Sequence, residues 1–249
     1  MTLEELNLIC WVWIGIAVGS FILLQFVSAP YGRHVRKGWG PQISNKLGWV
    51  LMEFPSLFII VYFFLTSEQG RYASLLSLLW VLHYLNRTFL YPLRIRTKGK
   101  KMPVAIVASA VFFNCVNAGL NGYYLAHFEH YDRESFLGWN FVLGIFLFAV
   151  GFFMNQKSDH MLIRLRKPGD TGYKIPKGFL FDLISCPNLF GELVQWFGFA
   201  LMACNLPAFT FFVWTFANLV PRAVRHHKWY REHFQNYPRN RKAIIPKIL

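Results

Sequence analysis

The sequence lacks the glycine signatures of the common nucleotide-binding folds, and it has few cysteines. No Gly-x-Gly-x-x-Gly follows a predicted strand and no glycine-rich loop ends in Gly-Lys-Ser or Gly-Lys-Thr, which excludes the Rossmann and P-loop arrangements. Any nucleotide would have to be bound by helix ends and loops. The 4 cysteines lie in or beside apolar stretches without paired spacing, which argues against disulfides and thiolate metal sites.

Acidic residues are scarce, and the chain contains neither an internal repeat nor a low-complexity linker. Because no repeat or linker divides the chain, we predict a single domain over residues 1–249. The 12 acidic residues stand against 26 lysines and arginines, which gives a formal net charge of +14. In a soluble protein this charge would suggest a nucleic-acid partner, so its distribution along the chain decides how it is interpreted.

Long apolar stretches dominate what the sequence does contain. Most of them approach the roughly 20 residues that a helix needs to cross the hydrocarbon of a bilayer. They predict an all-α fold, namely a polytopic membrane helix bundle with seven transmembrane helices. The predicted spans cover residues 6–27, 47–65, 75–91, 104–125, 136–154, 189–204 and 206–224.

The basic residues occupy only every second connection between these spans. Apart from Arg71, Arg87 and Arg133, every lysine and arginine lies in residues 29–46, 93–103, 155–188 or 221–249. The positive-inside rule places these four segments in the cytosol, with the amino terminus outside and the carboxyl terminus inside. The topology explains the charge, so we expect no nucleic-acid partner, while segments 155–188 and 221–249 can hold a phosphorylated ligand.

Ionisable groups inside the hydrocarbon are candidate functional residues, because burying them there is costly. Glu53 lies about six residues, or roughly 9 Å, from the cytosolic end of the second span. Tyr84 lies about seven residues, or roughly 10 Å, from the cytosolic end of the third, so the two are predicted at one depth. Tyr84, Arg87 and Tyr91 follow i, i+3, i+7 spacing along one helix face, which is too polar to face lipid.

Two interpretations of these residues remain open. In the first, Glu53 and Arg87 form a structural bridge between helices, and the tyrosines belong to an interfacial aromatic belt. In the second, a phenol hydrogen-bonded to a buried carboxyl donates to a carbonyl oxygen that gains negative charge during a reaction. The second interpretation suits an apolar ketone that enters from the bilayer.

Two further polar faces point toward the same cytosolic side. Asn155, Asp159 and Arg166 share a face at the end of the fifth span, and Arg222, His226 and Tyr230 share one beyond the seventh. Asn188 and Glu192 add polar groups at the sixth. These residue types match the phosphates, hydroxyls and rings of a nucleotide, but a solvated face that contacts anionic lipid has the same composition.

Histidines on the cytosolic side are too few for a metal site of the di-iron oxygenase kind. His226, His227 and His233 lie on that side, whereas His127 and His130 are predicted on the other. We therefore expect no metal.

Longer motifs extend these patterns through most of the chain. They are Tyr31-Gly32-Arg33-His34, Glu53-Phe54-Pro55-Ser56 after Trp49, His83-Tyr84 with Arg87-Thr88-Phe89 and Tyr91, Asn155, Ser158-Asp159, Leu165-Arg166-Lys167-Pro168-Gly169, Tyr173, Ile175-Pro176, Asn188 with Gly191-Glu192, Arg222-Ala223 to His226-His227 and Tyr230, Tyr237-Pro238, and Arg241-Lys242-Ala243 to Ile245-Pro246. With these motifs the chain closely resembles the membrane steroid 5α-reductases.

The resemblance implies NADPH-dependent reduction of the 4,5 double bond of a 3-oxo-Δ4-steroid to a 5α-steroid. By similarity, Tyr84 and Glu53 would be catalytic, holding the 3-carbonyl oxygen while hydride passes to C5 and C4 is protonated. Met52, Glu53 and Tyr84 would contact the steroid. The positions that match the family's cofactor residues are Trp49, Arg87, Tyr91, Asn155, Asp159, Arg166, Tyr173, Asn188, Glu192, Arg222, His226 and Tyr230.

Some positions depart from the family pattern. Met52 stands where better-known members carry glutamine, so one polar contact to the steroid is missing. Asn86 replaces a histidine, and Lys174 replaces an arginine, which removes a guanidinium fork from the cofactor region. These changes bear on which substrate is chosen more than on the reaction itself.

Two other classes of function are compatible with the terminal motifs. One is a membrane methyltransferase that uses S-adenosylmethionine on a lipid or a prenylated thiol, and the other is a non-catalytic sterol or lipid carrier. A reductase of another apolar enone is also open. We expect a monomer that contacts membrane lipid and resides in a bacterial inner membrane rather than the endoplasmic reticulum.

Overall fold

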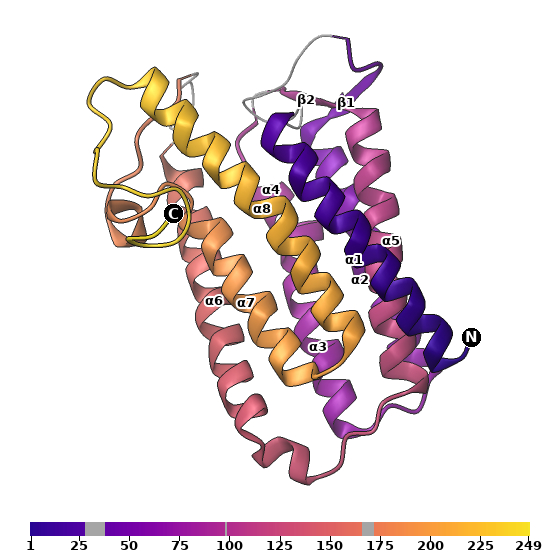
Figure 1. Ribbon diagram of the computed structural model, residues 1–249. Coiled ribbons are helices and arrows are strands. Elements are labelled where there is room, and N and C mark those ends of the chain that lie inside the picture. The colour runs from indigo at the N-terminus through magenta and orange to yellow at the C-terminus, as the bar shows by residue number, and fades with distance from the viewer. Residues whose placement is uncertain (28–37, 98, 166–171) are drawn as a thin grey trace. The chain divides into compact units, whose positions relative to one another are not determined.

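The computed structural model describes residues 1–27, 38–97, 99–165 and 172–249. These residues are almost entirely helical, with one small two-stranded sheet (Figure 1). The main helices are α1 (Leu3–Phe26), α2 (Asn45–Thr66), α3 (Arg71–Leu85), α5 (Val104–His127), α6 (Trp139–Arg164), α7 (Pro187–Ala203) and α8 (Leu206–His233). Each predicted apolar stretch contains one of these helices, and the ends differ most where α6 and α8 extend beyond the predicted spans and where the third stretch continues past α3.

The third stretch differs from the prediction of one regular helix. After α3 the chain forms a π-helix at Asn86–Leu90 and then the short helix α4 at Tyr91–Arg94. The wider turn changes the angular spacing of Arg87 and Tyr91 from that of an ideal α-helix, while Arg87 still contacts the Tyr91 ring. Short 3-10 turns at Glu134–Leu137 and Phe179–Asp182 precede α6 and α7. The predicted span start at Phe136 therefore lies in a turn.

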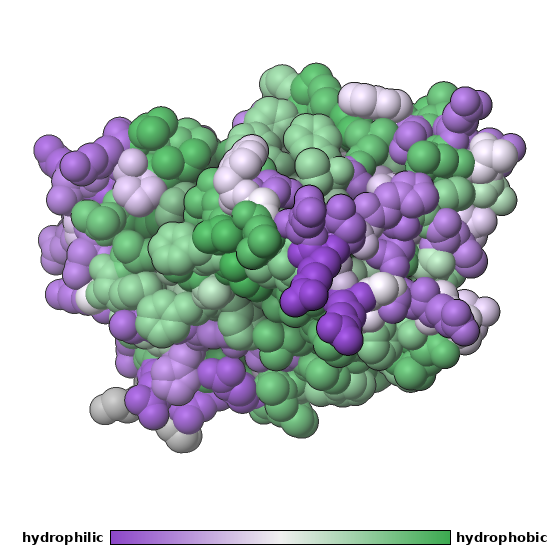
Figure 2. Space-filling view, turned by 90° about the horizontal axis from the view of Figure 1, so that it is seen from below, coloured by the Kyte–Doolittle hydropathy of each residue, from purple (hydrophilic) through white to green (hydrophobic). Residues whose placement is uncertain are grey.

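Apolar side chains exposed to the surroundings identify the helices as membrane spans. Four helices, α1, α2, α5 and α6, are long and apolar enough to cross a bilayer. Trp11, Phe58, Phe112 and Phe146 are among the large side chains that are more than half exposed on them. Figure 2 shows apolar residues spread over much of one face of the protein. The polytopic membrane helix bundle is thus confirmed, while the count of seven spans stays a prediction, since α3 and α7 are shorter, at 15 and 17 residues.

The chain packs as two compact units. Unit 1 consists of Met1–Val12, Ala29–Val142 and Met202–Ala208, and unit 2 of Trp13–Ser28, Leu143–Leu201 and Phe209–Leu249. The single domain over residues 1–249 stays a prediction.

Unit 1 is built around α2, which packs along α5 and against α3. Strand β1 (Gln42–Ser44) pairs antiparallel with β2 (Lys101–Pro103), and Ile43 lies opposite Met102. Met102 is 1% exposed and fills the space above Gly48, a position where a Cβ would collide with its sulfur. The small sheet therefore places the buried side chain of Met102 at one end of the α2–α5 pair.

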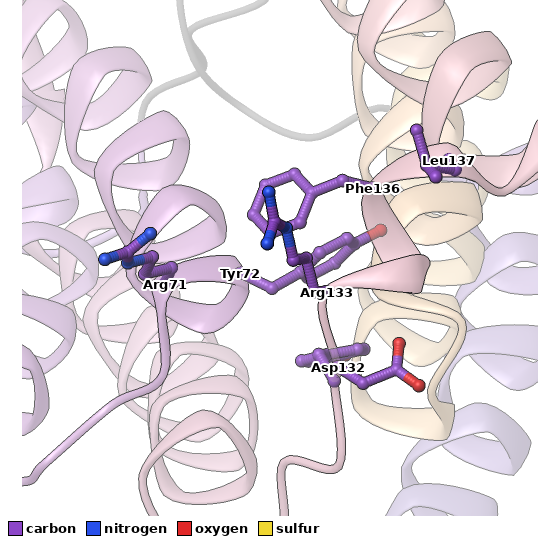
Figure 3. A pocket seen from close by; sticks show the side chains of 7 residues that line it. Arg71, Tyr72, Asp132, Arg133, Phe136 and Leu137 are labelled. Atoms are coloured by element: carbon purple, nitrogen blue, oxygen red, sulfur yellow. The ribbon is translucent and has the colours of Figure 1, made fainter.

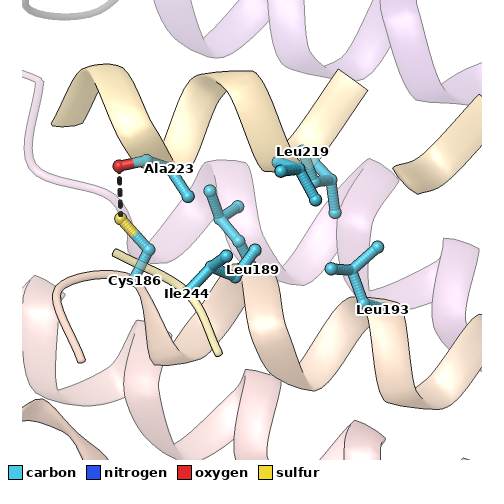
Figure 4. Packing of buried hydrophobic residues seen from close by; sticks show 7 residues of the cluster. Cys186, Leu189, Leu193, Leu219, Ala223 and Ile244 are labelled. Carbon is cyan, nitrogen blue, oxygen red and sulfur yellow. Dashed lines mark hydrogen bonds between the residues drawn. The ribbon is translucent and has the colours of Figure 1, made fainter. Parts of the chain in front are cut away.

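Unit 2 is held together by close contact between α6 and α7. A Cβ on Gly191 would lie 2.5 Å from the main-chain nitrogen of Asn155, and one on Gly151 would lie 2.5 Å from the carbonyl oxygen of Gly191. Helices that approach this closely need glycine at the contact. On the other side of α7, Leu189 and Leu193 pack against Leu219, Val220 and Ala223 of α8 in a cluster that includes Cys186 and Ile244 (Figure 4).

Candidate functional site

Arg87 lies over two aromatic rings in unit 1. Its guanidinium carbon is 4.7 Å from the centre of the Trp49 ring and 4.8 Å from that of the Tyr91 ring. These two rings meet edge to face at 5.1 Å. Contact of the cation with two ring faces restricts where the guanidinium can lie. The structure thus brings together three of the predicted cofactor residues.

Glu53 is contacted from two neighbouring segments. Its Oε1 is 3.9 Å from Nε of Arg87, and only 14% of its side chain and 12% of that of Arg87 are exposed. Its Oε2 is 3.4 Å from Nδ2 of Asn114 in α5. The interhelical pair considered from the sequence is present, and it does not exclude a catalytic role, because a carboxylate accepts several hydrogen bonds.

Tyr84 is 4% exposed and lies among aromatic side chains. Its ring stacks on Trp80 at 5.4 Å and meets His83 edge to face at 5.1 Å. Trp80 donates a 3.0 Å hydrogen bond to the carbonyl of Ser56. α2 and α3 run in opposite directions. Tyr84 comes between Trp80, which contacts Ser56, and Arg87, which contacts Glu53, so it lies at the level of residues 53–56. This agrees with the common depth predicted for Glu53 and Tyr84.

Met52, predicted to contact the substrate, lies beside Glu53 in an apolar environment. Its side chain packs with Met102 and Val107, and it is 8% exposed. Its main-chain oxygen accepts a 2.6 Å hydrogen bond from Nδ2 of Asn114. Sequence reasoning missed Asn114, although Asn114, Asn117 and Asn121 repeat at i, i+3, i+7 within an otherwise apolar span and would have been a signal.

Four predicted cofactor residues form one hydrogen-bonded network between α6 and α7 of unit 2. Nδ2 of Asn155 donates to the carbonyl of Asn188 at 3.0 Å and to Oε2 of Glu192 at 3.3 Å. Nδ2 of Asn188 donates to Oδ1 of Asp159 at 3.0 Å. Asn155 and Asp159 are 1% and 4% exposed, so this network is a fixed part of the interior.

The remaining predicted cofactor residues of unit 2 lie on α8 and before the Phe179–Asp182 turn. Arg222, His226 and Tyr230 lie on successive turns of α8, as their spacing predicts. Tyr230 is buried and stacks on Tyr237 at 5.2 Å. Tyr173 meets Trp229 edge to face at 4.9 Å. Arg166 lies outside the described residues.

A cluster around Ser185, which sequence reasoning missed, fixes the segment that follows α8. Oγ of Ser185 is 2.6 Å from Nδ1 of His227 and 2.6 Å from the hydroxyl of Tyr237, and it donates to the carbonyl of Lys242 at 3.1 Å. Burial, followed by the charges of Arg231 and Lys242, lowers the pKa of His227 below its usual value. Burial raises the pKa of Tyr237 above its usual value. Its hydrogen bonds with Ser185 and Arg241 lower the pKa, but by less. The adjacent His226-His227 motif was the only sequence signal.

Arg241 connects the same segment to the residues around Tyr173. It is 4% exposed, donates a 2.9 Å hydrogen bond to the carbonyl of Pro176, and lies 3.6 Å from a carboxylate oxygen of Asp182. Its guanidinium also lies over the Tyr237 ring at 5.4 Å. The residues between α6 and α7 are thus held by residues that follow α8.

A separate cavity of about 560 Å³ lies in unit 1, between the start of α3 and the connection that follows α5 (Figure 3). It is lined by Arg71, Tyr72, Tyr131, Asp132, Arg133, Phe136 and Leu137. Hydrogen bonds from Ser135 lower the pKa of Asp132, the carboxylate in a lining that also contains two arginines. None of the predicted site residues lines this cavity, so it is distinct from the site around Glu53.

The donor and acceptor types in unit 2 suit a dinucleotide. Carboxylates and amides at Asp159, Glu192, Asn155 and Asn188 match hydroxyls and a carboxamide, and the guanidinium of Arg222 matches phosphate. Among residues 1–27, 38–97, 99–165 and 172–249, no three histidine, cysteine or acidic side chains gather closely enough to hold a metal ion.

Comparison with known proteins gives full-length matches. A family model described as 3-oxo-5-alpha-steroid 4-dehydrogenase matches residues 100–249. The steroid 5-alpha-reductase DET2 of Gossypium hirsutum is 44% identical over 241 residues, which cover 94% of this chain and 93% of that protein. DET2 of Arabidopsis thaliana is 40% identical over 239 residues, covering 91% and 90%. The 3-oxo-5-alpha-steroid 4-dehydrogenase 1 of Rattus norvegicus is 37% identical over 234 residues, covering 92% and 90%.

These relatives come from plants and an animal. The expected bacterial origin and bacterial inner membrane therefore receive no support from them, whereas a multi-pass membrane protein agrees with the helices described above.

Proposed function

Since the chain belongs to the 3-oxo-5-alpha-steroid 4-dehydrogenase family, we propose that it reduces the 4,5 double bond of 3-oxo-Δ4-steroids with NADPH to give 5α-steroids. Family membership makes it an enzyme, a membrane-bound oxidoreductase of the steroid 5α-reductase type. The near-full-length similarity argues against the methyltransferase and carrier hypotheses. The choice of NADPH, the particular steroid and the roles of individual residues are our proposals.

The observation that carries the mechanism is the largely enclosed carboxyl of Glu53, 14% exposed, which lies at the level of the buried phenol of Tyr84. In our proposal Tyr84 donates a hydrogen bond to the 3-carbonyl oxygen, and Glu53 contributes to the same polar contact. Negative charge grows on this oxygen as C5 gains hydride, so a donor fixed beforehand stabilises the transition state more than the ground state. C4 then takes up a proton, and the ketone is restored.

NADPH, when bound, supplies the hydride. The side chains that would hold it are Trp49, Arg87 and Tyr91 in unit 1, and in unit 2 Asn155, Asp159, Tyr173, Asn188, Glu192, Arg222, His226 and Tyr230. Arg166 belongs to the set by resemblance alone. The buried α6–α7 network supports this assignment, because polar groups that are already ordered lose little entropy when a ligand binds.

The substrate is expected to reach this site from the bilayer. A steroid is almost wholly apolar, and the cluster of Met52, Met102 and Val107 next to Glu53 offers an apolar wall of matching chemistry. Methionine side chains adapt to irregular shapes, so this wall suits a rigid fused-ring body. We propose that the enzyme acts as a monomer, with membrane lipid as its other partner.

The direct test is incubation of the purified, detergent-solubilised protein with NADPH and testosterone or progesterone. Mass spectrometry and chromatography against standards should show a product heavier by two hydrogens with 5α stereochemistry. Consumption of NADPH with another apolar enone, but not with steroids, would keep the reductase and discard the steroid. No NADPH-dependent product from any enone would discard both.

Two substitutions test the residue roles. Glu53→Gln and Tyr84→Phe should each lower turnover by about tenfold or more, because each removes a group from the carbonyl contact. Both proteins should still fold and bind NADPH, as followed by thermal shift. Turnover close to that of the unaltered protein in both variants would contradict the proposed mechanism.

A further inference from the structure

We propose that Asn114 of α5 is a positioning residue for this reaction, because its side-chain amide fixes the orientation of the Glu53 carboxylate. The inference rests on the proposed function, since it gives Asn114 its role through Glu53. Asn114 lies in the middle of a span and is 4% exposed. A buried amide at such a place is costly unless its hydrogen bonds are made, so its partners indicate why it is there.

Both N–H bonds of the Asn114 amide have acceptors on the same turn of α2. Nδ2 lies 2.6 Å from the carbonyl oxygen of Met52 and 3.4 Å from Oε2 of Glu53. A carbonyl and a carboxylate only accept hydrogen bonds, so the NH2 group, and not the amide oxygen, must point toward them. The amide orientation follows from this chemistry alone.

The carbonyl oxygen of Met52 can accept this bond in addition to its helical one, because a main-chain carbonyl oxygen has two lone pairs. Pro55 lies inside α2 and has no N–H, which leaves the neighbouring carbonyl of Leu51 without its helical partner and loosens the helix beside Met52. The short bond to Met52 attaches α5 to this turn through a backbone atom. The amide is thereby anchored independently of Glu53, and its second N–H defines where Oε2 can lie.

The two oxygens of Glu53 are therefore held from different sides. Oε1 is near Arg87, whose guanidinium lies over the Trp49 and Tyr91 rings, and Oε2 is near Asn114. A carboxyl group fixed at both oxygens cannot rotate freely, and small errors in placing a reacting group are costly in rate. The side chain of Met52 has no amide group. At this level of the helices, the side-chain amide comes from Asn114 instead.

A nearby asparagine on the same helix provides a matched control. Asn121 is 2% exposed and lies two turns further along α5. Its Nδ2 donates to the carbonyls of Asn117 and Pro207, which are main-chain atoms away from Glu53. Removing either amide costs two buried hydrogen bonds, but only one of the two amides contacts the carboxylate.

The test compares Asn114→Leu, Asn114→Ser and Asn121→Leu. Leucine keeps the volume without donors, and the serine hydroxyl turns back to its own helix, so neither reaches Glu53. We expect both Asn114 variants to lose about tenfold or more in kcat per folded enzyme, with the Kd for NADPH within about twofold of normal. Asn121→Leu should lower the Tm and keep kcat within about twofold.

Asn114 variants with kcat within twofold of the unaltered enzyme would overturn the proposal, and so would an Asn121→Leu loss as large as that of Asn114→Leu. If Asn114→Leu does not fold, Asn114→Ser is judged by the same criteria. A protein that makes no NADPH-dependent product refutes the proposed function itself. An active enzyme in which Glu53→Gln is inactive and both Asn114 variants are unimpaired refutes only the role of Asn114.

Discussion

At the scale of single residues, the position of Arg87 over Trp49 and Tyr91 favours a guanidinium over an ammonium group. A lysine would keep the charge near Glu53 but would lose the broad guanidinium contact with the rings. We expect Arg87→Lys to lose about 1 kcal/mol of stability and to lower turnover, since Oε1 of Glu53 then lacks a fixed partner. The measurements are the Tm and steady-state kinetics.

Arg71→Lys is the control for this change. Arg71 is exposed at the first turn of α3 and has no stacked ring among the described residues. Equal Tm values and equal turnover in the two variants would show that stacking of Arg87 contributes nothing.

His227 gives the protein a predictable response to acid. Its pKa is lowered in the folded state, chiefly by burial, so the unfolded chain takes up a proton more readily. Stability from this residue is therefore complete above the unfolded pKa of about 6.5 and is lost as the pH falls below it. The Tm should fall between about pH 7 and pH 5 by more in the unaltered protein than in His227→Gln. Parallel Tm curves for the two proteins would contradict this assignment.

The site residues divide into those that sequence could predict and those that it could not. Glu53, Tyr84 and Arg87 stood out because ionisable groups inside an apolar span are rare. Asn114 and Ser185 were missed: the asparagine repeat in α5 marks a polar helix face, but only the structure shows which partner each of these uncharged residues contacts. Their partners, Glu53 and His227, are 61 and 42 residues away in the sequence.

At the scale of helices, glycines allow α6 and α7 to approach closely enough for the hydrogen-bonded network between them to form. Gly151 and Gly191 let the two backbones touch one turn from Asn155 and Glu192. We expect Gly191→Ala to cost about 1–3 kcal/mol, because the added methyl group meets main-chain atoms that cannot move aside. The affinity for NADPH should fall as well, as titration of the purified protein would measure.

Gly19→Ala in α1 is the matched change, because nothing lies within 4 Å of its new methyl group. It should be neutral or slightly stabilising, by up to about 1 kcal/mol, since alanine favours helix. If Gly191→Ala were equally harmless, close packing of α6 on α7 would not be what orders the network.

The π-helix at Asn86–Leu90 is the element that sequence reasoning could not foresee. Hydrophobic periodicity reports an average of 3.6 residues per turn, and a single wider turn changes that average too little to be seen. Yet this turn carries Arg87 and determines how it meets Tyr91. Such turns are frequent at functional sites, which agrees with the proposed role of this segment.

At the scale of the whole molecule, helix positions followed from the apolar stretches, while the basic residues predict which side of the membrane each connection faces. Cysteines introduced at Glu134 and at Arg239, in a background without the native ones, should react differently with an impermeant maleimide. We expect labelling at Glu134 in intact cells and at Arg239 only after permeabilisation. Labelling of both positions from one side would contradict the three spans predicted between them.

The bond from Arg241 to the carbonyl of Pro176 joins residues 65 positions apart. The ribosome makes Pro176 before α7 and α8, and Arg241 after them. The residues around Pro176 therefore cannot take their final position until both later helices and Arg241 have left the ribosome. During synthesis the enzyme passes through an inserted but incomplete form, and the ability to bind a nucleotide should be the last property that it acquires.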